Sequence, residues 1–425
     1  MRVISILAVF LLLTSLRCKR EAPGIIKDEN GVIISMPYLW KKSLHNGLGF
    51  HSNSLFRVSI TYNGNIAIPT TNGENVRQMT LINPDNGETI WSWDDRFQPA
   101  TERIYLFYAY QYNNLLTYQN GDRSYCINMV NGTTHWKYRR NSPYFDVISG
   151  LEDTFFVMGE SVSRYAQYHE KVVFKGNMQT GALEEFIVPD FTLNHIAPGD
   201  RIGDVTGVVP YRKNGVQYLA VIWQEPQNVT SINDWQTYLG LYNYDTNQWV
   251  YEKSVVNQPN INGVLLAPPV IYNDKIYLNV GKELFCHDLM TGDQIWSRQF
   301  YQDFMFSGFI IAEDKIIANN EDTYTYCLDP ETGDILWKTE TAGTSSRISY
   351  LNGIVYFVGG STGRLHALDI NTGRHVWKLQ SDLLDPEDVY SFKTNAVYVI
   401  PARNGKPPRV IALTHLYAYC FEAYR

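Results

Sequence analysis

The chain has 425 residues and a formal net charge of −7 at pH 7, and 44% of its residues are hydrophobic and 14% aromatic. This composition is typical of a folded globular protein, and the negative charge without a basic cluster argues against nucleic acid as a partner. No Pro/Ser-rich stretch or charge block divides the chain, so we expect one folded domain after the N-terminal segment.

The N-terminal segment has the pattern of a signal peptide. Residues 1–17 hold one early Arg and a mostly apolar run that is too short for an ordinary membrane-spanning helix. Cys18 follows directly and resembles the lipidated Cys of bacterial lipoproteins, although Leu16 and Arg17 replace the small residues usual before it. We expect a lipid anchor at Cys18 and a mature chain in the cell envelope, attached to the outer membrane. An uncleaved N-terminal anchor and an ordinary secreted protein are the alternatives.

The next predicted elements are a short linker over residues 18–37 and a single domain over residues 38–425. Residues 31–44 (G-V-I-I-S-M-P-Y-L-W-K-K-S-L) are rich in β-branched and aromatic residues, which favours a strand. We expect this strand, with Trp40, to be a spare one that completes a unit elsewhere in the chain.

Seven copies of an eleven-residue pattern follow along the chain. The pattern has an Asp or Asn, a Gly four residues later, and a Trp four residues after the Gly. It is clearest in A-L-D-I-N-T-G-R-H-V-W, and Gly333 and Gly373 in neighbouring copies are 40 residues apart. The third copy has Glu185 in the Trp position, and the fourth is two residues shorter and lacks the Gly. The copies lie at 81–91, 126–136, 175–185, 241–249, 286–296, 327–337 and 367–377.

Each position of the pattern has a physical reason. The Asp or Asn side chain accepts hydrogen bonds from the turn backbone, and Gly takes the positive φ that a tight turn needs. The Trp lies on the returning strand, where it can pack against a neighbouring unit. Further β-rich runs precede each copy, such as 347–351 and 354–359. Four strands in about forty residues is the period of a β-propeller blade.

The end of the chain indicates the number of blades. Cys126, Cys286 and Cys327 share one position of the pattern, and Cys420 repeats it just before the chain ends. An eighth blade therefore lacks its outer strand, which the N-terminal strand can supply. We predict an all-β, eight-bladed β-propeller of four-stranded antiparallel blades, closed by pairing the N-terminal strand with the C-terminal blade. Seven blades with terminal additions are the alternative.

The cysteines and the turn aspartates are predicted to have structural roles and not to bind a metal or take part in catalysis. The four cysteines of this position belong to different blades, too far apart to bridge, so we expect four buried free thiols. There is no C-x-x-C motif and no recognisable catalytic motif. Asp288, Asp329 and Asp369 could serve as metal ligands or bases, but their places in the pattern predict turn residues.

The pattern A-x-D-x-x-T-G-x-x-x-W resembles the pyrroloquinoline-quinone (PQQ)-like repeat, over nearly the whole mature chain. This family includes quinoprotein dehydrogenases, which hold PQQ and Ca²⁺ in the central channel, and non-enzymatic scaffold lipoproteins of outer-membrane protein assembly. Members of the second group have a similar length, begin with a lipidated Cys and form eight-bladed rings. The dehydrogenases resemble one another in a pair of adjacent cysteines, which this sequence lacks, and it has no C-x-x-C-H haem site. The resemblance thus implies a scaffold without cofactor, metal or catalytic residues.

Blades 3 and 4 depart from the repeat. Gly181 and Asn247 are 66 residues apart, and the excess includes segment 224–236, between the second and third strands of blade 4. Segment 159–167 lies between the corresponding strands of blade 3. Both segments should emerge on one face, where aromatic residues can anchor a partner. The predicted partner-binding residues are Tyr165, Trp223, Trp235 and Tyr238; alternatively, they pack the long loops onto their own blades.

The sequence therefore favours a monomeric, non-enzymatic lipoprotein that binds envelope proteins, including components of β-barrel assembly, and touches the membrane through its lipid. A propeller that binds glycans or small ligands is the second hypothesis. A PQQ-dependent dehydrogenase is the third, disfavoured by the missing Cys pair.

Overall fold

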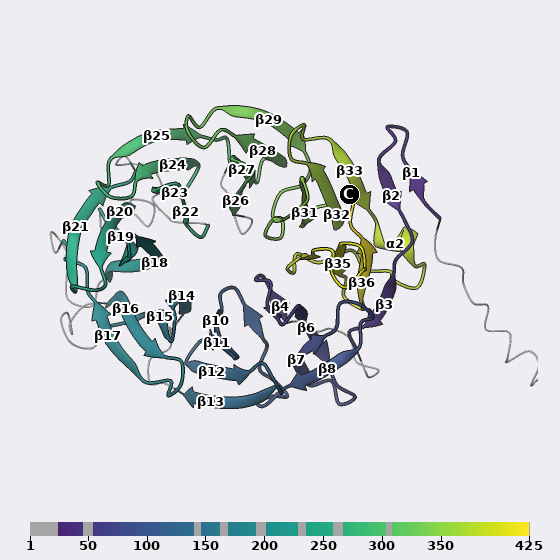
Figure 1. The fold of residues 1–425 in the computed structure, drawn as a ribbon, viewed down its shortest axis with the longest axis horizontal. Helices are drawn as coiled ribbons and strands as arrows, with labels where there is room; N and C mark the ends of the chain where they lie inside the picture. The colour runs from purple at the N-terminus through teal and green to yellow at the C-terminus, as the bar shows by residue number, and fades with distance from the viewer. Residues whose placement is uncertain are drawn as a thin grey trace, which may run out of the picture.

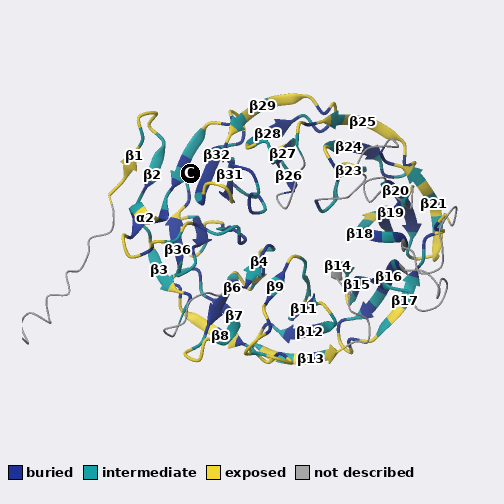
Figure 2. Ribbon diagram, turned by 180° about the vertical axis from the view of Figure 1, so that it is seen from behind, coloured by how far each residue is buried: buried dark blue, intermediate teal, exposed yellow. Residues whose placement is uncertain are grey.

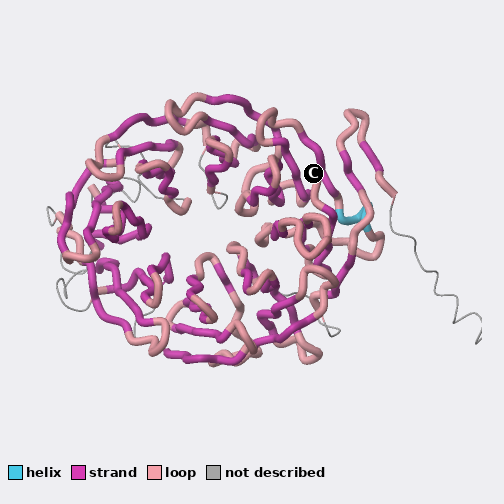
Figure 3. Tube along the Cα trace, in the orientation of Figure 1, coloured by secondary structure: helices cyan, strands magenta, loops and turns pink. Residues whose placement is uncertain are grey.

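The computed structural model describes residues 24–45, 54–139, 146–161, 169–192, 201–227, 235–257, 267–302 and 308–424. Figure 1 shows these residues as short strands arranged in a ring around a central opening. Within this part of the chain the one helix is α2 (Ser381–Leu384), a single turn at the rim (Figure 3). The expected all-β fold is confirmed.

Antiparallel four-stranded units repeat around the opening, with the first strand innermost and the fourth at the rim (Figure 1). Four units are separate sheets. Unit 1 is β5 (Thr61–Tyr62), β6 (Asn65–Thr71), β7 (Arg77–Ile82) and β8 (Thr89–Trp93), and unit 2 is β10 (Tyr110–Tyr112), β11 (Leu115–Asn120), β12 (Arg123–Asn128) and β13 (Thr133–Arg139).

Further along the chain, unit 5 is β22 (Val270–Tyr272), β23 (Lys275–Val280), β24 (Glu283–Asp288) and β25 (Gln294–Gln299). Unit 6 is β26 (Phe309–Ala312), β27 (Lys315–Asn319), β28 (Tyr324–Leu328) and β29 (Ile335–Glu340).

Units 3 and 4 share one sheet. Unit 3 is β14 (Asp146–Leu151), β15 (Thr154–Glu160), β16 (His169–Asn177) and β17 (Leu183–Ile187); unit 4 is β18 (Arg201–Lys213), β19 (Val216–Pro226), β20 (Trp235–Asn243) and β21 (Gln248–Val255). The third strand of unit 3, β16, also pairs in parallel with the innermost strand of unit 4, β18. A backbone ladder therefore joins these two neighbours, which are the units with the long connections.

Two further groups of strands complete the ring. Unit 7 is β30 (Ser349–Leu351), β31 (Ile354–Gly359), β32 (Arg364–Asp369) and β33 (His375–Leu379); the terminal sheet is β34 (Tyr398–Ile400), β35 (Arg409–Leu413), β36 (Tyr417–Glu422) and β3 (Trp40–Ser43). In the terminal sheet β3 pairs antiparallel with β36, so that Trp40 lies opposite Cys420. Near the opening, β4 (Leu55–Phe56) and β9 (Tyr105–Leu106) form a small parallel pair.

The N-terminal segment forms more than the one strand that we expected over residues 31–44. β1 (Ile26–Lys27) and β2 (Ile33–Ser35) form a hairpin, and β2 pairs in parallel with β33 at the rim of unit 7. Pro37 follows and has no N–H to donate to a ladder, so the chain leaves unit 7 there and enters the terminal sheet as β3. The segment that we expected to be a linker thus includes a hairpin that covers one outer strand.

Burial follows the order of the strands in each unit: the second and third strands are mostly buried, and the outer strands are the most exposed (Figure 2). The repeated Trp connects each unit to the next. Its indole N–H donates to a backbone carbonyl in the neighbouring turn, and its ring lies where a Cβ on the turn glycine would be, at 2.6 Å for Gly132 against Trp91. The bonds run from Trp40 to Pro84, Trp91 to Met129, Trp136 to Met178, Trp296 to Pro330 and Trp337 to Ile370, at 2.8–3.0 Å.

Trp377 of unit 7 is the exception to this pattern. The next group is the terminal sheet, which has no turn between its third and fourth strands because β3 comes from the other end of the chain. Trp377 is 1% exposed and contacts Tyr356 and Phe421, but its indole nitrogen has no hydrogen-bond partner among the described residues. The missing turn therefore leaves one buried donor unsatisfied.

The copy of the pattern in unit 4 is complete, so the prediction that it is two residues shorter was wrong. Asn243 takes the Asp position, and its side-chain oxygen accepts hydrogen bonds from two turn amides at 3.0 and 3.1 Å. Asn247, with φ of 56°, takes the Gly position, since Asn tolerates the left-handed region. Tyr251 takes the Trp position: its hydroxyl donates to Leu289 O at 2.9 Å, and its ring lies against Gly292.

The predictions for the turn aspartates and the cysteines are confirmed. The carboxylate of Asp288 accepts hydrogen bonds from the amides of Met290 and Thr291 at 2.8 and 2.9 Å, and Asp329 and Asp369 do the same in their turns. The four described cysteines are free and fully buried, and burial raises the pKa of each thiol to about 12.

Candidate functional site

Unit 4 carries the longest strands of the ring. β18, β19 and β20 have 13, 11 and 9 residues, whereas β23 and β24 of unit 5 have 6 each. Because strand direction alternates within a unit, β15 and β19 end on the same face, opposite the repeated glycine turns. We call this face, which also carries the connections between units, the loop face. The long strands of unit 4 run toward it.

Two of the predicted partner-binding residues do not form a surface. Trp223 is fully buried and Tyr238 is 9% exposed. They lie opposite each other on β19 and β20, with stacked rings whose centroids are 5.7 Å apart, and both belong to the core that units 3 and 4 share. The prediction that they are exposed was wrong because β19 continues to Pro226, so that Trp223 faces the interior of a sheet.

Of the other two predicted residues, Trp235 is described and Tyr165 lies outside the described residues, as does Cys18. Trp235 is half-buried at the first position of β20, opposite Pro226. Its carbonyl accepts a hydrogen bond from the side chain of Asn257 at 3.2 Å. Trp235 is therefore a partly exposed aromatic side chain on a strand end that the backbone holds in place.

A partly buried ion pair that the sequence did not suggest supports this strand end. Glu225 is 1% exposed and accepts hydrogen bonds from Lys253 at 2.8 and 3.0 Å and from the indole of Trp223 at 3.0 Å. The ammonium of Lys253 also lies 4.2 Å from the ring centroid of Tyr238. We had assigned Glu225 to a loop, where a charged residue is ordinary. Its place inside β19 makes it a link between β19 and β21.

The described residues around the central opening leave a small cavity whose lining does not fit PQQ with Ca²⁺. It has a volume of about 230 Å³ and lies between Arg347, Tyr108 and residues 267–269, and its lining contains no carboxylate that could bind a calcium ion. Arg347 donates to Phe107 O at 2.9 Å and lies 5.3 Å from the ring centroid of Tyr108. The described residues contain no group of three or more His, Cys, Asp or Glu that could hold a metal ion.

Comparison with known proteins identifies the repeat. A family model described as "Outer membrane protein assembly factor BamB" matches residues 240–379 and 281–415. The outer membrane protein assembly factor BamB of Shewanella oneidensis is 23% identical over 124 residues, covering 26% of this chain. The chain carries PQQ-like repeats and resembles BamB. The aligned part spans only 31% of the length of this BamB.

Solved structures extend the likeness to BamB over the fold. BamB from Moraxella catarrhalis has a TM-score of 0.55 at 10% identity, covering 91% of this chain and 98% of that one. The quinohemoprotein alcohol dehydrogenase from Comamonas testosteroni has a TM-score of 0.58 at 9% identity, covering 91% and 77%. A BamB and a dehydrogenase are thus equally similar in shape, and the fold alone does not separate a scaffold from an enzyme.

Proposed function

We propose that this protein is a non-enzymatic, extracytoplasmic lipoprotein that binds other proteins of the cell envelope. In this proposal the seven units and the terminal sheet are eight blades of one ring, which β3 closes. A lipid on Cys18 attaches the monomeric ring to the outer membrane. Within the described residues no helix is long and apolar enough to cross a membrane. By analogy with BamB, the partners include components of β-barrel assembly.

The observation that carries this proposal is the extension of unit 4 toward the loop face. The ladder between β19 and β20 continues to the pair Pro226–Trp235, and the Glu225–Lys253 ion pair fixes the strand ends beneath it. Trp235 is therefore presented on a rigid support, and such an aromatic side chain loses little conformational entropy when a partner covers it.

The first test is the substitution Trp235→Ala in the full-length protein. Truncating a half-buried side chain at the end of a ladder should leave the ring folded, and removing an aromatic anchor should cost binding about 2 kcal/mol. The tagged protein is recovered from cross-linked, detergent-solubilised envelopes, and the captured proteins are compared with those of the wild type. We expect β-barrel assembly components with the wild type and at least a tenfold loss with the variant.

Tyr301→Ala is the matched control, because Tyr301 is 79% exposed on the connection between units 5 and 6, also on the loop face. Capture that falls equally in both variants would contradict a surface centred on unit 4. Recovery of other envelope proteins would retain the scaffold and discard the assembly role. A deletion of residues 225–234 is a poor test, because it removes the buried carboxylate of Glu225.

The remaining alternatives are a ligand-binding propeller and a PQQ enzyme. A cavity on the ring that is lined in part by hydroxyl and cationic side chains favours the ligand-binding alternative as a second activity. Incubation of the purified protein with PQQ and Ca²⁺ tests the enzyme: a bound quinone chromophore after gel filtration would contradict our proposal.

A further inference from the structure

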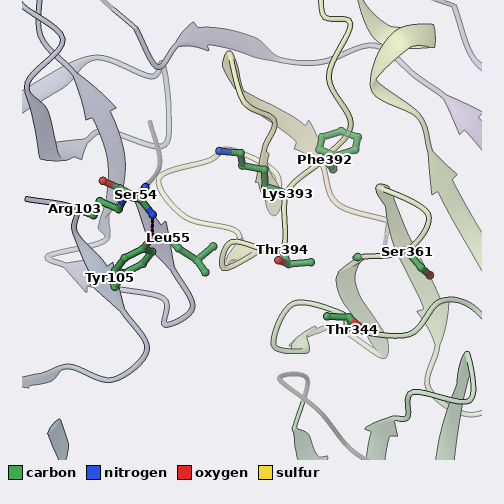
Figure 4. A pocket seen from close by; sticks show the side chains of 10 residues that line it. Ser54, Leu55, Arg103, Tyr105, Thr344, Ser361, Phe392, Lys393 and Thr394 are labelled. Atoms are coloured by element: carbon green, nitrogen blue, oxygen red, sulfur yellow. Dashed lines mark hydrogen bonds between the residues drawn. The ribbon is translucent and has the colours of Figure 1, made fainter. Parts of the chain in front are cut away.

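A second, larger cavity lies beside the central opening, where four connections between units and the β31–β32 turn of unit 7 meet. Its volume is about 660 Å³, which is within the range of small-molecule sites. Figure 4 shows three walls: Ser54, Leu55, Arg103 and Tyr105 on one side, Thr344 and Ser361 opposite them, and Lys393 with Thr394 between. These residues belong to β4, β9 and the connections around units 6 and 7 and the terminal sheet.

The walls of this cavity are held in place by the backbone. β4 and β9 form the first wall, where Leu55 lies opposite Tyr105. The connection that carries Lys393 is joined to β4, because the side chain of Asn395 accepts a hydrogen bond from the amide of Phe56 at 2.8 Å. The amide of Lys393 itself donates to Leu413 O at 2.8 Å. The site is therefore preformed, and a ligand that binds there would cause only a small loss of conformational entropy in the protein.

Thr344 on the opposite wall has an unusual backbone conformation. Its φ is 49°, which is rare for a β-branched residue. The carboxylate of Glu321 maintains it, accepting hydrogen bonds from the amide of Thr344 at 2.7 Å and from its hydroxyl at 2.8 Å. Strained residues held in this way gather at ligand sites. Glu321 is thereby engaged by Thr344 behind the wall.

Two cations give the cavity its charge. Lys393 is half-buried, and burial lowers the pKa of its ammonium group to about 8, so it remains largely protonated at pH 7. Arg103 lies at the exposed rim and donates to the hydroxyl of Tyr105 at 2.8 Å. In Figure 4 the amine of Lys393 points toward the wall that carries Ser54 and Arg103. An anionic group between them would gain charge-assisted hydrogen bonds.

The lining also includes the apolar side chains of Leu55 and Phe392, together with hydroxyl groups that are suited to a ligand with many hydroxyls of its own. Ser54, Tyr105, Ser361 and Thr394 bring hydroxyls from all three walls, and each hydroxyl both donates and accepts. The volume exceeds what a single phosphate ion fills. We propose that this cavity binds an acidic sugar, with the carboxylate or phosphate between Lys393 and Arg103 and the sugar hydroxyls on the serine and threonine side chains. This site is independent of the protein-binding surface on unit 4.

Calorimetric titration of the full-length protein with digalacturonate, cellobiose and inorganic phosphate tests the proposal. We expect digalacturonate to bind at least tenfold more tightly than the other two. Cellobiose should bind more weakly because it has no charge to pair with Lys393 and Arg103. Phosphate should bind more weakly because it can contact these two cations but not the hydroxyl side chains. The affinity for digalacturonate should fall as the pH rises through about 8, since Lys393 then loses its proton. No binding of digalacturonate, or equal binding of phosphate, would overturn the assignment.

Two variants place the site. Lys393→Met keeps the length of the side chain, and Arg103→Gln changes an exposed residue, so both should fold; each should weaken digalacturonate binding at least tenfold. Lys282→Met is the control, because Lys282 is an exposed lysine on the loop face of unit 5. Unchanged affinity for digalacturonate in both cavity variants would show that the sugar does not bind in this cavity. An equal loss of affinity in Lys282→Met would show the same.

Discussion

The carboxylate of Glu170 lies inside the sheet that units 3 and 4 share, and it is 2% exposed. Burial is the main cause that raises the pKa of Glu170 to about 7; a hydrogen bond from Ser161 opposes this rise, and the nearby carboxylates of Glu185 and Glu160 add to it. Since the unfolded chain has the ordinary value of 4.5, the folded chain binds this proton more tightly. The free energy of unfolding should therefore decrease as the pH rises from about 4.5 to about 7.

The substitution Glu170→Gln tests this pH dependence. Glutamine has nearly the same shape and no charge, so the variant should be more stable than the wild type at pH 8 and lose less stability between pH 5 and pH 8. Urea unfolding at the two pH values measures both effects. Glu184→Gln is the control, because Glu184 is exposed in the same unit and its surface pair with Lys175 contributes little. An equal pH dependence in wild type and Glu170→Gln would contradict the role of Glu170.

Single residues also explain which parts of the structure the sequence could predict. The turn aspartates, the glycines and Trp40 follow from the repeat, because each position has one local physical role. Trp223 and Tyr238 were misplaced because β19 is longer than in other units, and length is set by packing between units 3 and 4. Lys393 and Arg103 lie on connections outside the repeat, so no pattern brings them together before the fold does.

At the scale of the element, the fourth strand of every unit except units 3 and 7 carries an aromatic side chain that donates a hydrogen bond to the next unit. In unit 4 this side chain is Tyr251, whose hydroxyl donates a hydrogen bond to the carbonyl of Leu289 in unit 5, as the Trp indole N–H does to a backbone carbonyl in other units. Tyr251→Phe should lower the free energy of unfolding by about 1 kcal/mol, since it leaves the carbonyl of Leu289 without this donor. Urea unfolding of the variant measures the effect.

Tyr242→Phe provides the comparison for this element, since Tyr242 lies in the same unit on the third strand and no described hydrogen bond of its hydroxyl reaches the next unit. A loss of stability in Tyr242→Phe as large as that in Tyr251→Phe would show that the bond to Leu289 is not the cause. The comparison works because both substitutions remove a single hydroxyl from a mostly buried ring.

At the scale of the whole molecule, the two ends of the chain hold neighbouring parts of the ring. β3 covers β36, and Trp40 reaches Pro84 of unit 1. Asp85 in the same turn pairs with Arg409, Arg403 and Lys406 of the terminal sheet. The junction between the terminal sheet and unit 1 therefore combines a backbone ladder, an indole hydrogen bond and an ion-pair network.

Two truncations separate the contributions of the N-terminal strands. A chain that starts at residue 37 loses β1 and β2 and should keep its monomeric state with a slightly lower Tm. A chain that starts at residue 44 also loses β3, which exposes the edge of β36, and should show a Tm lower by several degrees and self-association. Thermal unfolding and size-exclusion chromatography measure these outcomes. Equal behaviour of the two chains would contradict a structural role for β3.

The pairing of β3 with β36 also constrains the order in which the molecule can be made. The ribosome releases β3 nearly four hundred residues before β36, so β3 stays without its partner while all other units form. A nascent chain can build units 1 to 7 progressively, but it cannot complete the terminal sheet before β36 has been made. Premature release, or a stop codon within the final strand, would therefore leave both ends of the product open to pairing with other chains.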